Sequence, residues 1–194
     1  MQTYALDMND FAAINPMLDM VFATLQRVDI SLIAHGTLPD QSACQRELNT
    51  ALREFSNNGL SVIALLTLLG NRLELQRHGS LAVISSVAGD RGRPSNYLYG
   101  TAKAAVTTFC EGLRSRLFKA GVHVLTIKPG LVDTPMTQGL PLPKVLVATP
   151  ERVARDILSA IYKKKDSIYT PAIWAGVMLI ICNLPRVIFK RISL

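Results

Sequence analysis

Cysteine is scarce in this sequence: only Cys44, Cys110 and Cys182 occur among 194 residues, far apart and without a CxxC pair. Structural metal sites need closely spaced Cys and His ligands, so we expect no metal site. An odd number of dispersed thiols, which we expect to be buried, is typical of a reducing compartment rather than of a disulfide-bonded secreted protein.

Targeting and membrane-spanning segments are also missing. The opening residues, MQTYALDMN, have neither a basic start nor an apolar run, so we expect no secretory signal peptide. The most apolar stretch, 172–184, holds 13 residues interrupted only by Asn183, fewer than the roughly 20 that a transmembrane helix needs. We therefore expect a cytoplasmic protein.

The apolar tail, residues 172–194, has two interpretations, and both stay open. It is either an anchor on the inner face of a membrane, with Trp174 and the terminal cations at the headgroups, or a helix packed on the domain or on a partner subunit. In both cases we separate it from a domain formed by residues 1–171.

Acidic residues are outnumbered by basic ones, 14 against 21, which gives a formal net charge of +7. The basic residues are scattered, apart from 163–165 and the last turn of the chain. Cations are favourable at the end of a helix, so the lysine triplet predicts a solvated helix C-terminus. We expect no nucleic-acid partner, because such proteins usually gather their basic residues on one face.

Short apolar runs alternate with longer helical stretches, which predicts an α/β fold with a parallel sheet. Strands are expected over 3–7, 29–36 (buried), 80–86, 122–130 and 167–171. Helices are expected over 10–28, 44–56, 57–77 (with a bend near Asn58-Gly59), 101–121 and from Pro150 onward, with Thr149 as the N-cap. The proline-rich residues 135–148 are expected to form a mobile loop.

Polar residues and glycines follow several of the expected strands. The ends of four strands carry Asp7, His35-Gly36, Ser85-Ser86 and Pro129-Gly130. Ligands of parallel α/β sheets bind at the carboxyl ends of the strands. We therefore expect these four positions to converge on one crevice.

Tyr99 and Lys103 are four residues apart, so they project from one face of a helix. A lysine ammonium stabilises a phenolate, so we expect Lys103 to lower the pKa of Tyr99 from its ordinary value of about 10. Such a tyrosine can donate a proton to a carbonyl oxygen, or take one from an alcohol, while a hydride is transferred. Ser86, 13 residues before Tyr99, can hydrogen-bond to the same oxygen.

With an asparagine 28 residues before Ser86, this pattern resembles the short-chain dehydrogenase/reductase family. The resemblance implies a Rossmann-like, doubly wound parallel sheet, an NAD or NADP cofactor, and a catalytic tetrad of Ser86, Tyr99, Lys103 and Asn58. In that family the asparagine holds a water that relays protons. Asn57 stays open as the alternative, although the spacing favours Asn58.

The resemblance also implies contacts with the cofactor. The positions that it marks are Asp7 for the adenine ring, Gly36, Tyr99 and Lys103, and Pro129, Gly130, Val132 and Thr134 of a PGxVxT segment near the nicotinamide. Gly36 is the one residue kept from the family's NNAG motif, and His35 is expected to be a packing residue. Residues 135–148 would form the substrate-binding loop.

The family's glycine-rich TGxxxGxG turn, which binds the pyrophosphate, is not in this sequence. We therefore expect an N-terminally truncated form that lacks the first two βα units of the sheet. Because the pyrophosphate-binding turn is absent, whether this form binds the cofactor has to be measured. Two functions follow: an NAD(P)-dependent oxidoreductase acting on a ketone or secondary alcohol, or a catalytically incompetent fragment that serves as an interaction or membrane-associated protein.

Three segments, AHGTLPD, ISSVAGDRGRPSNYLYGTAK and VMLIICNLPRVIFKR, are similar to a membrane-associated branch of the family typified by decaprenylphosphoryl-2-keto-ribose reductase. This similarity implies a small-molecule or lipid-linked sugar substrate. Family members commonly pair through the helix that carries the tyrosine, so a homo-oligomer is expected. The small residues Gly100, Ala102, Ala104 and Ala105 would allow close packing there.

Overall fold

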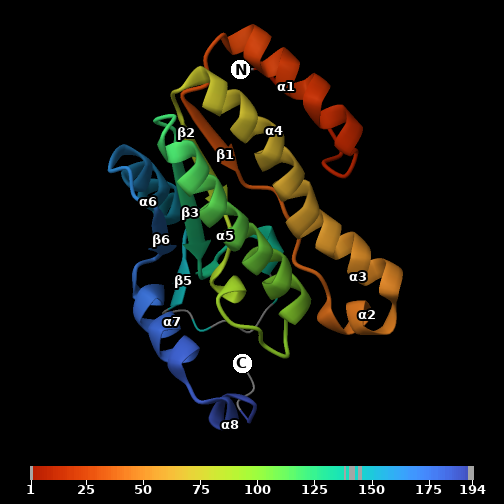
Figure 1. Ribbon diagram of the computed structural model, residues 1–194. Coiled ribbons are helices and arrows are strands. Elements are labelled where there is room, and N and C mark those ends of the chain that lie inside the picture. Colours follow the sequence, from red (N-terminus) through yellow and green to blue (C-terminus); the bar gives the residue numbers. More distant parts are fainter. Residues whose placement is uncertain (1, 138, 140–142, 144–145, 192–194) are drawn as a thin grey trace.

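A four-stranded parallel sheet forms the centre of the computed structural model, which describes residues 2–137, 139, 143 and 146–191 (Figure 1). Its strand order is β1-β2-β3-β6, with β1 Ile30–Ile33, β2 Ser80–Ile84, β3 His123–Pro129 and β6 Ser167–Thr170. Two short strands, β4 Leu131–Val132 and β5 Val147–Ala148, form a separate parallel pair. The predicted parallel α/β architecture is confirmed.

The helices overlap the predicted ones, but α5 begins four residues earlier than expected, and the helix expected over 44–56 is divided at Glu47 into two. Their bounds are α1 Phe11–Leu25, α2 Gln41–Arg46, α3 Leu48–Phe55, α4 Ser61–Gln76, α5 Tyr97–Phe118, α6 Pro150–Tyr162, α7 Ile173–Asn183 and α8 Arg186–Phe189. A π-helical segment, Ser56–Leu60, joins α3 to α4, at the bend expected near Asn58. The Thr149 hydroxyl accepts a hydrogen bond from the Arg152 amide, so the predicted N-cap of α6 is confirmed.

Helices cover the two faces of the sheet unequally. On one face α4 and α5 pack against β1, β2 and β3, and α1 packs on the outer side of α4 (Figure 1). This larger core contains Leu66, Leu73 and Leu81, all fully buried. On the other face α6 packs against β2 and β3 through Val153 and Ile157. The sheet is thus wound on both sides.

Two strand predictions are wrong. Residues 3–7 form no strand, because a strand needs a neighbour to pair with and no described strand lies beside them. Residues 30–33 do form β1, but this strand is not buried: Ile30 is 45% and Leu32 49% exposed. Both side chains lie on a face of β1 that no described helix covers.

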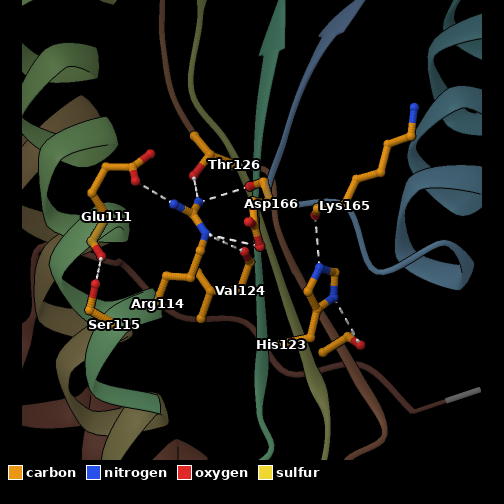
Figure 2. Close-up of polar contacts among 9 residues, drawn as sticks. Glu111, Arg114, Ser115, His123, Val124, Thr126, Lys165 and Asp166 are labelled. Atoms are coloured by element: carbon orange, nitrogen blue, oxygen red, sulfur yellow. Dashed lines mark hydrogen bonds and ion pairs between the residues drawn. The ribbon is translucent and has the colours of Figure 1, made fainter. Parts of the chain in front are cut away.

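Arg114 of α5 joins the far part of that helix to the sheet (Figure 2). Its guanidinium donates to the Val124 carbonyl at 2.9 Å, to the Thr126 hydroxyl at 2.8 Å and to the Asp166 carbonyl at 2.8 Å, and it pairs with Glu111. A delocalised cation with five donors suits several acceptors at once. Arg114 thereby fixes α5 against β3 and the turn before β6.

The C-terminal helix α7 packs on the domain through one face only. Trp174, Met178 and Ile181 are buried against Val87, whereas Leu179 and Ile180 are each 67% exposed. Of the described helices, none has the length and apolar character needed to cross a membrane. Cys182 of α7 is exposed, so the expectation that all three thiols are buried is wrong for this one.

Candidate active site

Three strand ends meet at one edge of the sheet. Because β1, β2 and β3 are parallel and adjacent, the residues that follow them, Gly36, Ser86 and Gly130, lie at the same edge. Asp7 does not follow a strand, and it lies in an exposed turn where it accepts a bond from the Asn9 amide. The Asn9 side chain connects this turn to the π-helical segment through Ser56 and Asn57.

The start of α5 brings Ser86, Tyr99 and Lys103 together. The Ser86 hydroxyl lies beside the Tyr99 phenol, close enough to lower the pKa of that phenol. The Lys103 ammonium lies 5.6 Å from the centre of the Tyr99 ring and donates to the Ile84 carbonyl at 3.2 Å. The Gln41 side chain accepts from the Leu98 amide at 3.0 Å and so satisfies a free donor of the first turn of α5. This is the predicted cluster, assembled from β2 and α5.

The two serines at the end of β2 have different partners. Ser85 is 1% exposed, and its hydroxyl donates to the Lys103 carbonyl at 2.9 Å and lies 2.7 Å from the Thr107 hydroxyl. These contacts fix the strand end to α5. Ser86 instead accepts from the Ala88 amide at 3.1 Å and faces Tyr99. The geometry therefore favours Ser86 as the serine available to a substrate oxygen.

Burial governs the ionisation of Tyr99 and Lys103. It raises the pKa of the Tyr99 phenol, and the neighbouring Ser86 hydroxyl offsets only part of that effect. The same cause lowers the pKa of Lys103 to about 8. The expected lowering of the Tyr99 pKa by Lys103 is therefore wrong for this structure, because desolvation of the buried phenol is the largest influence on its pKa and raises it. Near neutral pH Tyr99 is a proton donor.

Asn58 lies in the π-helical segment, and its side chain is fully buried. A π-helical turn disrupts the regular hydrogen bonds of an α-helix, and it often marks a functional position. Here the Asn58 amide donates to the Glu54 carbonyl at 3.0 Å, while its Oδ1 accepts from the Thr37 amide at 2.9 Å. Asn57, the alternative, bonds instead to Asn9 near the surface.

Gly36 separates Asn58 from Lys103. A Cβ added at Gly36 would lie 2.8 Å from Asn58 Oδ1 and 3.5 Å from Lys103 Nζ, so a side chain would fill the space between them. The neighbouring His35 donates from Nε2 to the Ser61 hydroxyl, which itself donates to the Asn57 carbonyl. Burial, followed by the charge of Lys103, lowers the pKa of His35. His35 is thus a neutral, hydrogen-bonded packing residue, as expected.

Glycines allow α5 to lie against the 3-10 turn Val87–Gly89 that follows Ser86. A Cβ at Gly100 would lie 2.7 Å from the Ala88 carbonyl oxygen, and one at Gly89 would lie 2.8 Å from the backbone of Lys103. Gly100 and Ala102 are therefore buried inside the chain, and they are not free to pack against a second subunit as the sequence suggested. They hold Tyr99 and Lys103 close to Ser86.

We expect Gly100→Ala to lower the free energy of unfolding by about 1–3 kcal/mol, since the new methyl group meets a backbone oxygen that cannot rotate away. Gly112→Ala on the same helix is the matched control. Nothing lies within 4 Å of its added Cβ, so helix propensity alone predicts a gain of about 0.5–1 kcal/mol. Urea unfolding of both variants measures the difference, and equal effects would refute the close-packing argument.

The PGxVxT segment runs from the end of β3 into β4. Trp174 of α7 packs against Gly130 so closely that any Cβ there would overlap the indole. Val132 pairs with Ala148 of β5, and the Thr134 amide donates to the Thr137 hydroxyl at 3.2 Å. Pro129 closes β3 beside Thr170. The expected substrate loop, 135–148, lies partly outside the described residues.

A polar cluster beside Ser86 was not predicted from the sequence. Asp90 forms an ion pair with Lys128 at 2.7 Å and accepts from the Tyr169 hydroxyl at 2.7 Å. These side chains come from a loop and two strands that are far apart in the chain, so no local motif marks them. Thr37 was also missed, although its place directly after Gly36 could have indicated it.

Comparison with known sequences identifies relatives along the whole chain. The family model "short chain dehydrogenase" matches residues 1–143. An uncharacterized oxidoreductase from Mycobacterium tuberculosis is 33% identical over 189 residues, which cover 97% of this chain and 76% of that protein. An uncharacterized oxidoreductase from Streptomyces coelicolor is 32% identical over 166 residues, which cover 85% of this chain and 65% of that protein.

Solved structures share the fold at low sequence identity. A short chain dehydrogenase from Burkholderia cenocepacia, in complex with NADP, gives a TM-score of 0.81 at 18% identity, covering 96% of this chain and 76% of that one. ElxO with NADP bound gives a TM-score of 0.77 at 20% identity, and the match covers 89% of this chain and 78% of that one. From the extent of the family match and the identity to full-length relatives, the chain belongs to the short-chain dehydrogenase family.

Proposed function

We propose that the site is that of an NAD(P)-dependent oxidoreductase which reduces a ketone to a secondary alcohol. The observation that carries the proposal is the placement of Tyr99 beside Ser86, with the buried Lys103 ammonium 5.6 Å from the centre of the phenol ring. The raised pKa of Tyr99 favours the reductive direction, because a protonated phenol is the form that donates to a carbonyl oxygen.

The residues present fit the nicotinamide half of the cofactor. Gly36 leaves open the space beside Lys103 Nζ, and that ammonium has donors to spare after its one bond to Ile84. Lys103 and Tyr99 would hold the nicotinamide ribose, and Gly130, Val132 and Thr134 would lie near the carboxamide. Asp7, in its exposed turn, would be the adenine contact. The pyrophosphate half lacks its glycine-rich turn in this sequence.

A bound nicotinamide would supply the hydride. Ser86 orients the substrate oxygen by donating a hydrogen bond, since its hydroxyl already accepts from the Ala88 amide. Tyr99 donates its proton to that oxygen as the negative charge develops. The Lys103 ammonium, with its pKa near 8, then stabilises the phenolate. Asn58 would position a water in the space beside Gly36, from which the proton is restored.

For the substrate we propose a polyprenyl-phosphoryl keto-sugar, which the protein would bind at the cytoplasmic face of a membrane. The exposed side of the tail supports this proposal. Leu179, Ile180, Val187 and Ile188 are 49–67% exposed, and Arg186 and Lys190 stand among them. Apolar side chains flanked by cations are typical of helices that lie on anionic lipid. A homo-oligomer remains part of the proposal.

Calorimetric titration of the 194-residue chain with NADH and NADPH tests the function. The proposal expects micromolar binding of at least one of them, followed by oxidation when a ketone is added. An absence of binding and turnover would favour the second candidate, an interaction protein. The observation behind that candidate is the open edge of β1, where Ile30 and Leu32 are nearly half exposed.

A further inference from the structure

The loop between Ser86 and α5 contains polar atoms that are buried without a partner. Arg93 Nε and Nη2 and Asn96 Oδ1 have no hydrogen-bond partner among the described residues, and each of these atoms is inaccessible to solvent. A buried cation or amide left unpaired destabilises a fold. Such atoms need an explanation, and a functional role or a bound ion is among the usual ones.

The unpaired atoms have complementary chemistry. Nε–H and Nη2–H lie on the same side of a guanidinium and point in parallel, which matches the two oxygens of a phosphate or a carboxylate. Asn96 Oδ1 is an acceptor, so it matches a hydroxyl group. Asn96 stands at the N-cap of α5, yet its side chain makes no capping bond. Its Oδ1 therefore has no hydrogen-bond partner within the part of the chain that the structure describes.

No acidic group near Arg93 is free to neutralise it. The nearest interacting carboxylate is that of Asp90, but one of its oxygens pairs with Lys128 and the other accepts from Tyr169. The side chains of Asp90 and Lys128 are only 11% and 15% exposed, so this pair is hardly screened by solvent. Asp90 therefore favours the Arg93 charge only as a carboxylate already paired with Lys128, and no ion pair of Arg93 itself is present within the described residues.

These atoms belong to the same turn, and they lie close to the reacting group. The Asn96 amide donates to the Arg93 carbonyl at 3.2 Å, which closes the turn between them. Tyr99 follows Asn96 by three residues on α5, which is about one helical turn. A ligand held by this turn is therefore placed beside Tyr99 and on the loop that leads from Ser86.

We infer that Arg93 and Asn96 form a substrate-anchoring subsite, in which Arg93 binds an oxyanion and Asn96 accepts a hydrogen bond from a neighbouring hydroxyl. This inference rests on the proposed function, and it narrows the substrate class to hydroxylated ketones that carry a phosphate or a carboxylate. The subsite binds and orients; Tyr99 and Ser86 perform the chemistry.

Calorimetry on the whole chain, without nicotinamide, tests the subsite separately from catalysis. The probes are ribose 5-phosphate, ribonate and ribose. We expect one of the two anions to bind at least about tenfold more tightly than ribose, since charge-assisted hydrogen bonds are the stronger kind. Arg93→Gln removes that preference, and Arg93→Lys weakens it because an ammonium lacks the parallel donors. Lys163→Gln, an exposed lysine at the end of α6, is the charge control and leaves binding unchanged.

Two further measurements sharpen the test. Asn96→Ala is expected to weaken the binding of ribose and of ribose 5-phosphate by similar factors, because it removes a contact with a hydroxyl group that both compounds share. The ligand-free Arg93→Gln protein is expected to melt no lower than the parent chain, since it loses an unpaired buried charge. If Arg93→Gln proves unfolded, the binding test is made with Arg93→Lys, which is expected to weaken the preference for the anions.

Three results would overturn the inference. In the first, neither anion binds more tightly than ribose; in the second, Arg93→Gln binds the anions as the parent chain does. The third uses 2′,5′-ADP, titrated as a mimic of the cofactor's adenosine half: if Arg93→Gln weakens the binding of this compound alone, Arg93 serves the cofactor and not the substrate. A different result is possible: the anions bind through Arg93, but the protein transfers no hydride. That result would support the subsite and refute the oxidoreductase proposal. The two failures are thus distinguishable.

Discussion

Tyr99→Phe is expected to lower ketone reduction by a factor of about 10²–10⁴, the usual contribution of a positioned general acid. The phenol supplies the proton that neutralises the developing alkoxide, and burial keeps this phenol protonated near neutral pH by raising its pKa. Turnover is measured as NADH or NADPH oxidation at saturating ketone. The loss should appear in kcat, because phenylalanine keeps the ring that fills the site.

Tyr97→Phe is the matched control for this prediction. Tyr97 lies two residues earlier on α5 and is 43% exposed, so losing its hydroxyl should leave turnover unchanged. Equal circular dichroism and melting of both variants would show that the fold is intact. If Tyr99→Phe retained most of the parent rate, Tyr99 would not be the proton donor and the proposed chemistry would be wrong.

Leu66→Ala is expected to lower the free energy of unfolding by about 2–5 kcal/mol, the range for a leucine removed from a rigid core. Leu66 is fully buried in α4, within the larger core between the helices and the sheet. Truncation removes apolar contacts and leaves a cavity that close-packed neighbours cannot fill. Equilibrium unfolding in urea measures the change at constant m-value.

Leu75→Ala provides the comparison on the same helix. Leu75 is 86% exposed, so the same chemical change there should alter stability by about 0.5 kcal/mol or less. Because both substitutions exchange the same residue types within α4, helix propensity cancels between them. A Leu66→Ala effect as small as that of Leu75→Ala would mean that the core is not packed as described.

Local patterns were sufficient to predict much of this fold. Alternating apolar runs located β1, β2, β3 and β6, and the N-cap at Thr149 located the start of α6. The i, i+4 spacing placed Tyr99 and Lys103 on one face of α5, and the strand end placed Ser86 beside them. These features depend on residues that are close in sequence or on the common direction of parallel strands.

The remaining features depend on contacts between distant segments. Whether residues 3–7 form a strand is decided by a neighbouring strand, and an apolar alternating run alone cannot supply one. The exposure of Ile30 and Leu32 depends on which helices cover β1. The raised pKa of Tyr99 depends on how deeply α5 is buried. The unpaired Arg93 could be recognised only once its neighbours were placed.

Trp174 is the only tryptophan of the chain, and its buried indole lies directly against Gly130 at the end of β3. The tryptophan fluorescence of the protein, excited selectively at wavelengths where its five tyrosines do not absorb, therefore originates from one point, beside the segment predicted to receive the nicotinamide. A ligand that displaces α7 or changes the surroundings of Gly130 will alter that emission. The molecule thus carries a spectroscopic probe of its own at the junction between the tail and the reaction site.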